Sequence, residues 1–251
     1  MRVLITGASS GLGRDMAYEL AKRGFDLVLV ARREDRLSQI RDNVSVKCDI
    51  ITADLTKTEE VIKVYNEAGK VDILINNAGF GVFGEFLKTD LDEEMNMLYT
   101  NVRAMHMLMK LYVKAFEKQG GGRILNVASA AAFCPGPMFA GYYATKAYMY
   151  RLSISVAREL EMMGSKTKIS VLCPGPVKTE FGTVANVSFG LYGLDSKYVA
   201  EYAVEKLLKG KKVIVPGKLM QCARFLTKLL PDSILARITA KIQSQKVLKG
   251  E

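Results

Sequence analysis

Short apolar runs alternate with amphipathic stretches along the first 217 residues of the chain. Continuous apolar runs predict buried strands, and apolar residues spaced three and four apart predict helices. The predicted strands lie near residues 2–6, 27–30, 47–53, 71–75, 123–127, 169–172 and 213–215, and the helices between them include residues 34–43, 57–69, 91–118, 140–163 and 196–209. Such an alternation indicates a parallel sheet covered by helices on both faces. We therefore predict one α/β domain over residues 1–217, built on a doubly wound sheet of about seven strands.

The pattern changes after residue 217. Residues 218–251 carry apolar positions at helical spacing that are interrupted at Pro231, so we predict two helices, the second beginning near Asp232. The apolar positions are Leu219, Met220, Ala223, Leu226 and Leu230 in the first helix and Ile234, Leu235, Ile238 and Ile242 in the second. From Lys211 onward the chain has a net charge of +7, out of +10 for the whole protein.

Two interpretations of this basic tail stay open. Its helices pack on the domain or on a partner subunit, or they form a basic amphipathic surface that lies on an anionic membrane. Nucleic-acid binding is not expected, because Phe225 is the only aromatic residue in the tail and unpaired bases stack on aromatic side chains.

The composition adds three expectations. Apolar residues make up 49% of the chain and charged residues 25%, as in soluble globular proteins. The four cysteines show no paired spacing and His106 is the only histidine, so we expect reduced thiols and no metal site. No apolar run reaches the roughly 18 residues of a membrane-spanning helix, and the chain opens on a strand-like run instead of a secretory leader. We therefore expect a cytoplasmic protein.

A glycine-rich turn follows the first predicted strand. Residues 6–13 read Thr-Gly-Ala-Ser-Ser-Gly-Leu-Gly. A strand, a glycine turn and a helix N-terminus together present free N–H groups and the positive end of a helix dipole to a phosphate. Gly7 would allow the tight turn, Gly11 a close approach of the backbone, and Gly13 close packing of helix on strand. The alternative is a glycine-rich turn that binds nothing.

Two arginines, Arg32 and Arg33, stand at the end of the second predicted strand. A dinucleotide fold that selects NAD carries an acidic side chain here, which accepts hydrogen bonds from the ribose 2′-hydroxyl. Guanidinium groups suit a 2′-phosphate instead. The sequence therefore predicts NADP(H) as the cofactor, and a solvated helix start is the alternative.

A tyrosine and a lysine four residues apart share one face of the predicted helix at 140–163. These are Tyr142 and Lys146. An ammonium beside a phenol stabilises the phenolate, so we expect Lys146 to lower the pKa of Tyr142 and make it a usable proton donor. Many helices carry such a pair by chance. Tyr143, three residues before Lys146, could also share this face.

Together with further motifs, these features make residues 1–217 resemble the short-chain dehydrogenase/reductase family. The motifs are the turn at 6–13, Asp54-Leu55, Asn76-Asn77-Ala78-Gly79, Asn101, the set of Ser129, Tyr142 and Lys146, and Pro174-Gly175-Pro176-Val177-Lys178-Thr179. The resemblance implies a Rossmann-type fold and a catalytic group of Asn101, Ser129, Tyr142 and Lys146. With the two arginines, it implies cofactor binding by Gly7, Ser9, Ser10, Gly11, Leu12, Gly13, Arg32, Arg33, Asp54, Leu55, Asn77, Ala78, Gly79, Tyr142, Lys146, Pro174, Gly175, Val177 and Thr179.

The resemblance also implies a role for each catalytic residue. Tyr142 would donate the proton and Ser129 would hold the carbonyl oxygen during hydride transfer between the nicotinamide and a carbonyl or alcohol carbon. Lys146 would also hydrogen-bond the nicotinamide ribose, and Asn101 would anchor a water that links Lys146 to solvent. A homodimer or homotetramer formed through the helices at 91–118 and 140–163 is expected from the family.

The substrate is expected to be an apolar ketone or aldehyde, of a steroid-like, fatty or xenobiotic kind. Apolar residues dominate the two predicted walls, 133–139 and 180–194. The second wall holds Phe181, Val184, Val187, Phe189, Leu191 and Tyr192 between Gly182, Gly190 and Gly193, which predicts a mobile lid. A 3-oxoacyl-type reductase and a non-catalytic sensor of the NADP redox state are the alternative functions.

Overall fold

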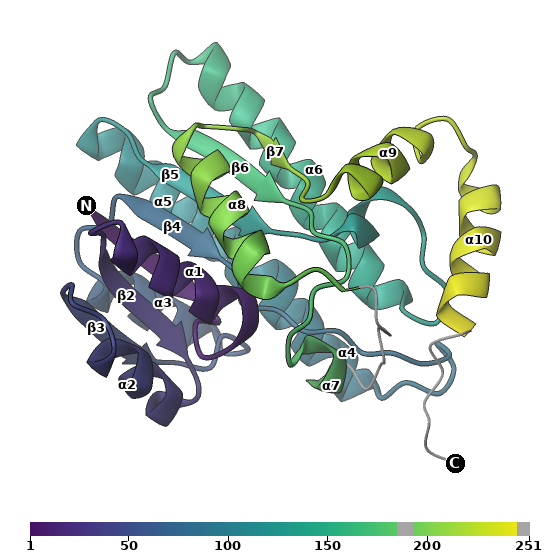
Figure 1. Ribbon diagram of the computed structural model, residues 1–251, viewed down its shortest axis with the longest axis horizontal. Helices are drawn as coiled ribbons and strands as arrows, with labels where there is room; N and C mark the ends of the chain where they lie inside the picture. The colour runs from purple at the N-terminus through teal and green to yellow at the C-terminus, as the bar shows by residue number, and fades with distance from the viewer. Residues whose placement is uncertain (185–192, 245–251) are drawn as a thin grey trace.

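The strands form one parallel sheet. The computed structural model describes residues 1–184 and 193–244. Within these residues the sheet has seven strands in the order β3-β2-β1-β4-β5-β6-β7, which confirms the predicted fold class (Figure 1). The strands are β1 (Arg2–Thr6), β2 (Asp26–Ala31), β3 (Cys48–Thr52), β4 (Ile73–Asn76), β5 (Arg123–Val127), β6 (Lys168–Leu172) and β7 (Val213–Ile214). The helices are α1 (Gly11–Lys22), α2 (Glu34–Asp42), α3 (Thr58–Glu67), α4 (Leu91–Leu98), α5 (Met105–Gln119), α6 (Ala140–Met162), α7 (Phe181–Val184), α8 (Ser196–Leu208), α9 (Lys218–Leu226) and α10 (Asp232–Ser244).

The apolar side chains of each strand divide between the two faces of the sheet. Leu4, Val28 and Leu74 pair in register and belong to the core shared with α3, α5 and α6. Their neighbours Ile5 and Leu29 point the other way, into the core shared with α1, α2 and α8. Because helices cover both faces, successive strand positions are all apolar and the strands show no polar alternation.

The strand order reverses between β1 and β4, and side chains tie the ends of these two strands together. Thr6 Oγ1 accepts hydrogen bonds from the backbone N–H groups of Asn77 and Ala78, each at 3.0 Å. The Asn77 amide donates in turn to the carbonyl of Thr6 at 3.0 Å. Ligands of such sheets bind beyond the carboxyl ends of the strands at this reversal.

The helix predicted at residues 91–118 contains a change of periodicity. α4 ends at Leu98, a π-helical segment covers Tyr99–Ala104, and α5 continues the helix to Gln119. Gly120, with a left-handed φ of 86°, ends it as the sequence predicts. Single π-helical turns within α-helices are frequent at functional sites, and this one carries Asn101.

The tail forms the two predicted helices, α9 and α10, on either side of Pro231. Figure 1 shows both at one end of the molecule, with α10 standing apart from the sheet. Thr239 Oγ1 donates to the carbonyl of Pro135 at 2.8 Å, and Gln243 Nε2 donates to Tyr143 Oη at 2.8 Å. These contacts hold α10 against the wall of a cavity. None of the described helices is long and apolar enough to cross a membrane.

Candidate active site

A cavity of about 720 Å³ opens at the carboxyl ends of the strands. The segments that follow β1 to β6 make its wall, together with α6 and one side chain of α10. Every residue predicted to be catalytic or to bind the cofactor lines this cavity except Gly13 and Asn101. Of the substrate wall predicted at 133–139, only Phe139 lines it. Phe80, Val82 and Gln243 also line it, and no motif pointed to them.

The glycine-rich turn leaves no room for side chains. Gly7 and Gly11 have φ values of 64° and 52°, which residues with a Cβ rarely adopt. A Cβ on Gly7 would lie 2.8 Å from Ala78 Cα, and a Cβ on Gly13 would overlap the carbonyl of Gly7. Gly13 therefore allows α1 to pack on the turn and does not face the cavity. The turn leads into the N-terminus of α1, where a phosphate would be stabilised.

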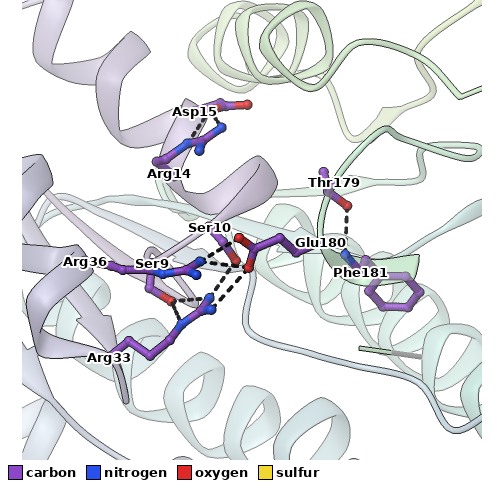
Figure 2. Close-up of polar contacts among 9 residues, drawn as sticks. All are labelled: Ser9, Ser10, Arg14, Asp15, Arg33, Arg36, Thr179, Glu180 and Phe181. Atoms are coloured by element: carbon purple, nitrogen blue, oxygen red, sulfur yellow. Dashed lines mark hydrogen bonds and ion pairs between the residues drawn. The ribbon is translucent and has the colours of Figure 1, made fainter. Parts of the chain in front are cut away.

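Arg33 lies over the glycine-rich turn. Its guanidinium donates to Ser9 Oγ at 3.1 Å and to Ser10 Oγ at 3.0 Å (Figure 2). Arg32 lines the cavity. Burial raises the pKa of Asp54, but hydrogen bonds from Thr56 and, to a smaller extent, the charge of Arg32 lower it by more in total. A cation beside the phosphate-binding turn suits a phosphate on the adenosine ribose.

A carboxylate occupies the other side of this arginine. Glu180 pairs with Arg33 at 3.1 Å and with Arg36 at 2.6 Å, and both guanidinium groups point toward its carboxylate in Figure 2. Hydrogen bonds from Arg36, and then from Arg33, lower the pKa of Glu180. The sequence predicted no binding role for Arg36 and placed Glu180 only at the start of the expected lid. Arg36 could have been found, because it lies three residues after Arg33 at the start of a helix.

Ser129, Tyr142 and Lys146 meet on the opposite side of the cavity. Tyr142 is 8% exposed, and Ser129 lies near enough to lower its pKa. Lys146 is buried, with its ammonium 5.6 Å from the centre of the Tyr142 ring and donating to the carbonyl of Val127 at 2.9 Å. The structure therefore brings together the three side chains expected to act on the substrate.

The expectation that the pKa of Tyr142 is lowered is wrong. Burial raises the pKa of Tyr142, and the hydrogen bond from Ser129 only partly opposes this effect. Burial also lowers the pKa of Lys146 to about 8. The physical reason is that apolar surroundings disfavour both the phenolate and the ammonium, and the ammonium points at a carbonyl oxygen instead of the phenol.

Asn101 lies behind the cavity wall. It is fully buried; its amide accepts from the N–H of Phe80 at 3.1 Å and donates to the carbonyl of Phe80 at 2.8 Å and to Thr145 Oγ1 at 3.1 Å. A Cβ on Gly79 would lie 2.9 Å from Asn101 Oδ1 and 3.4 Å from Lys146 Nζ, so the three groups are neighbours. These contacts join the π-helical segment to the segment after β4, and the water link stays a prediction.

Tyr143 has surroundings of its own. Its ring lies 6.3 Å from that of Tyr142 in a T-shaped arrangement, and it packs on Gly136, where any Cβ would clash. Its hydroxyl accepts from Gln243, and burial raises its pKa to about 12. Gln243 is 100 residues away in the chain and belongs to no motif, so no sequence signal could have found it.

Aromatic side chains surround the Tyr142 ring. Phe139 stacks on it at 4.5 Å between ring centres, and Phe181 lies 5.3 Å away. Thr179, expected near the nicotinamide, lies against Gly11 and accepts from the N–H of Phe181 at 3.3 Å (Figure 2). Residues 185–192 of the expected lid, which include Val187, Phe189, Gly190, Leu191 and Tyr192, fall outside the described residues.

Comparison with known proteins identifies relatives of this chain. The family model for short chain dehydrogenase matches residues 1–187. A ketoacyl reductase from Nostoc is 33% identical over 237 residues, which cover 91% of this chain and 82% of the relative. The human 17-beta-hydroxysteroid dehydrogenase type 3 is 32% identical over 195 residues, which cover 74% of this chain and 62% of the relative.

Solved structures agree in fold. A short-chain dehydrogenase from Sphingobium yanoikuyae in complex with NADPH superposes with a TM-score of 0.80 and 29% identity, over 92% of this chain and 97% of that one. A Burkholderia phymatum structure in complex with NAD has a TM-score of 0.82 at 22% identity over 90% and 92% of the two chains, which supports the fold alone. The chain is an oxidoreductase of the short-chain dehydrogenase/reductase family, whose members use nicotinamide cofactors.

Proposed function

We propose that this protein interconverts a carbonyl and an alcohol with NADP(H), using Tyr142 as the general acid and base. The observation that carries the proposal is the meeting of Ser129, Tyr142 and Lys146 in the same cavity as the glycine-rich turn. A binding protein that only sensed the cofactor would have no need of a buried phenol and ammonium beside an aromatic pocket.

A bound nicotinamide would supply or accept the hydride. During reduction, the Tyr142 hydroxyl gives its proton to the carbonyl oxygen, a step of the kind worth about 100- to 10,000-fold in rate. Ser129 donates a hydrogen bond to the same oxygen as negative charge develops on it. The Lys146 ammonium keeps a positive charge beside the phenolate that proton transfer leaves on Tyr142.

The preference for NADP(H) is supported by the arginines. Arg33 is fixed over Ser9 and Ser10 at the entrance to the turn, where it can pair with a 2′-phosphate. The solved relative with NADPH bound adds support. Neither Asp26 nor Glu34 lines the cavity, so an acidic side chain selective for NAD is lacking among its described lining residues.

A bulky apolar ketone is the proposed substrate class. Phe139, Phe181, Phe80 and Val82 form an apolar wall around the position where the carbonyl would meet Tyr142. One of the relatives is by name a 17-beta-hydroxysteroid dehydrogenase, and a steroid skeleton is bulky and apolar. A 3-oxoacyl substrate is the second candidate, because another relative is by name a ketoacyl reductase.

A cofactor and substrate screen tests the proposal. NADPH oxidation would be followed across apolar cyclic ketones, 3-oxoacyl thioesters and sugars, with NADH as the matched cofactor. We expect turnover of the apolar ketones and higher kcat/KM with NADPH. Turnover only of charged or sugar substrates would overturn the substrate class, and a preference for NADH would overturn the role of Arg33. NADPH binding without turnover of any carbonyl would favour the sensor.

A further inference from the structure

Gln243, the tail residue that lines the cavity, has a buried hydrogen-bond acceptor with no partner among the described residues. Gln243 is 1% exposed, and its Nε2 donates to Tyr143 Oη at 2.8 Å. Its Oε1 is buried and has no hydrogen-bond partner among residues 1–184 and 193–244. Buried amide oxygens are nearly always paired, so an exception that lines a substrate cavity points to a partner on the ligand.

Together, Gln243 and Tyr143 offer a ligand one donor and one acceptor. Tyr143 Oη accepts from Gln243, which leaves its own O–H for a ligand, and Gln243 Oε1 can accept. Exchanging the amide oxygen and nitrogen of Gln243 would keep one donor and one acceptor. A hydroxyl group, which both donates and accepts, complements this pair.

The pair is fixed in place beside the reacting position. The Tyr143 ring packs on Gly136 and lies 6.3 Å from the Tyr142 ring. The hydrogen bond from Thr239 to Pro135 docks α10 on the same wall. A polar pair held by packing on both sides loses little freedom when it binds a ligand.

We propose that Gln243 and Tyr143 bind a hydroxyl group of the substrate, close to the carbonyl that Tyr142 protonates. This inference rests on the proposed function and narrows its substrate class to bulky apolar ketones that carry a hydroxyl group. A site that hydrogen-bonds a substrate hydroxyl discriminates strongly against the analogue without it, because its own buried groups then stay unpaired.

The test uses the full chain with NADPH and two kinds of probe, a decalone and a set of hydroxydecalones whose hydroxyl is moved around the ring system. We expect at least one hydroxydecalone to exceed the parent decalone about tenfold or more in kcat/KM. Gln243→Leu and Tyr143→Phe should each reduce that ratio toward one, chiefly through KM. Gln221→Leu is the matched control, since Gln221 lies on α9 and donates to the carbonyl of Val215 at 3.0 Å, away from the cavity wall.

The outcomes separate this inference from the proposed function. If no ketone is turned over, the proposed function fails and the inference falls with it. If ketones are turned over but no hydroxydecalone is favoured, only the inference is overturned. An equal loss of kcat/KM on both probes in Gln243→Leu would mean that Gln243 merely docks α10, and this also overturns it.

A second, independent observation concerns the outer surface of α9 and α10. Large apolar side chains are exposed there, Leu219 at 79% and Phe225 at 63%, and the full set is Leu219, Phe225, Leu226, Leu229, Leu230, Ile234, Ile238 and Ile242. No residue of α9 is buried. Large exposed apolar side chains gathered on two successive helices are typical of an interaction site.

Exposed basic residues accompany these apolar side chains. Lys218, Lys228, Arg237 and Lys241 are all exposed. On α10, positions 234, 238 and 242 share one face, and Arg237 and Lys241 border it. An apolar stripe with a basic border is typical of helices that lie in the interface of an anionic membrane.

We propose that the outer surface of α9 and α10 binds an anionic lipid bilayer. A second copy of the chain fits less well, because a twofold contact would set the same basic side chains against each other. Negative headgroups would instead attract each Lys and Arg near the surface. Because Gln243 of α10 lines the cavity, this binding would bring the cavity close to the lipid.

Sedimentation with vesicles tests this proposal on the full chain. We expect phosphatidylserine-containing vesicles to bind about tenfold more tightly than pure phosphatidylcholine vesicles, with the difference reduced by salt. Replacing Phe225 and Leu226 by Ser should abolish binding, and Leu87→Ser, at a 95% exposed apolar position outside the tail, should not. Equal binding to both vesicles, or binding that survives the double substitution, would overturn the proposal. So would a dimer that the double substitution dissociates.

Discussion

Two adjacent tyrosines of α6 have different partners. Ser129 lowers the pKa of Tyr142 and Phe139 stacks on its ring, whereas Tyr143 accepts a hydrogen bond from Gln243. Neighbouring helical positions point about 100° apart, so the two hydroxyls cannot serve the same carbonyl oxygen equally. Helical spacing alone left this choice open, and the family resemblance selected Tyr142. The effect of Ser129 on the pKa of Tyr142 favours the same assignment.

Substituting each tyrosine by phenylalanine tests that choice. Tyr142→Phe should lower kcat by about 100-fold or more while the NADPH dissociation constant changes little, because only the proton donor is lost. Tyr143→Phe should retain turnover, with its effect confined to KM. Steady-state kinetics and fluorescence titration of NADPH measure the two quantities. The assignment is wrong if Tyr143→Phe is the inactive variant.

Lys146 should make reduction depend on pH near 8. Burial lowers its pKa to about 8, so the ammonium that stabilises the Tyr142 phenolate is lost as the pH rises through that value. We expect kcat/KM for ketone reduction to fall above pH about 8, whereas Tyr142, whose pKa burial raises, stays protonated. The Lys146→Arg variant should turn over more slowly, but its kcat/KM should not fall above pH about 8, because arginine keeps its charge. A flat profile for the wild type up to pH 10 would contradict this role.

The same shift has a consequence for stability. The unfolded chain holds the Lys146 proton up to its ordinary pKa of 10.5 and the folded chain only up to about 8. Between these values the unfolded state binds more protons, so this residue's contribution to the free energy of unfolding rises with pH there. Below pH 8 both states hold the proton, so the buried charge lowers the free energy of unfolding by an amount that does not change with pH.

At the scale of elements, Glu180 connects the segment before α7 to α2. Its carboxylate pairs with Arg33 and Arg36, where the 2′-phosphate of the proposed cofactor would also bind. The two anions would compete for Arg33. Because the ion pairs are exposed, this competition is weak.

Glu180→Gln should therefore tighten NADPH binding by about two- to fivefold and leave NADH binding unchanged. Arg33→Ala should weaken NADPH binding and also leave NADH binding unchanged. Fluorescence titration of both cofactors provides the measurement. Weaker NADPH binding in Glu180→Gln would show instead that Glu180 orients the arginines for the phosphate.

At the scale of the whole molecule, the cofactor would touch segments that follow most strands of the sheet. A ligand that binds only the folded state at one hundred times its dissociation constant stabilises that state by about 2.7 kcal/mol. For a chain of this size, that raises Tm by roughly 5–10 °C. We expect NADPH to give this shift in a thermal melt and NADH at the same concentration to give a smaller one. Equal shifts would contradict the predicted selectivity.

The amino-acid sequence by itself determined the order of strands and helices, the glycine-rich turn, and the position of Tyr142 and Lys146 on one helix. These features depend on local rules: a buried strand is apolar at every position, a helix repeats every 3.6 residues, and Gly7 is required by a backbone angle. The π-helical turn at Asn101 was not predicted by those rules, and the hydrogen bonds of Asn101 to the distant backbone of Phe80 follow no local pattern.

Only the tertiary structure decided which residues complete the site. Gln243 reaches Tyr143 across 100 residues of chain, and Glu180 reaches Arg36 across 144. No spacing rule relates such positions. The direction of the Tyr142 pKa shift was also settled there, because it depends on burial, and burial exists only once the cavity around Tyr142 has formed.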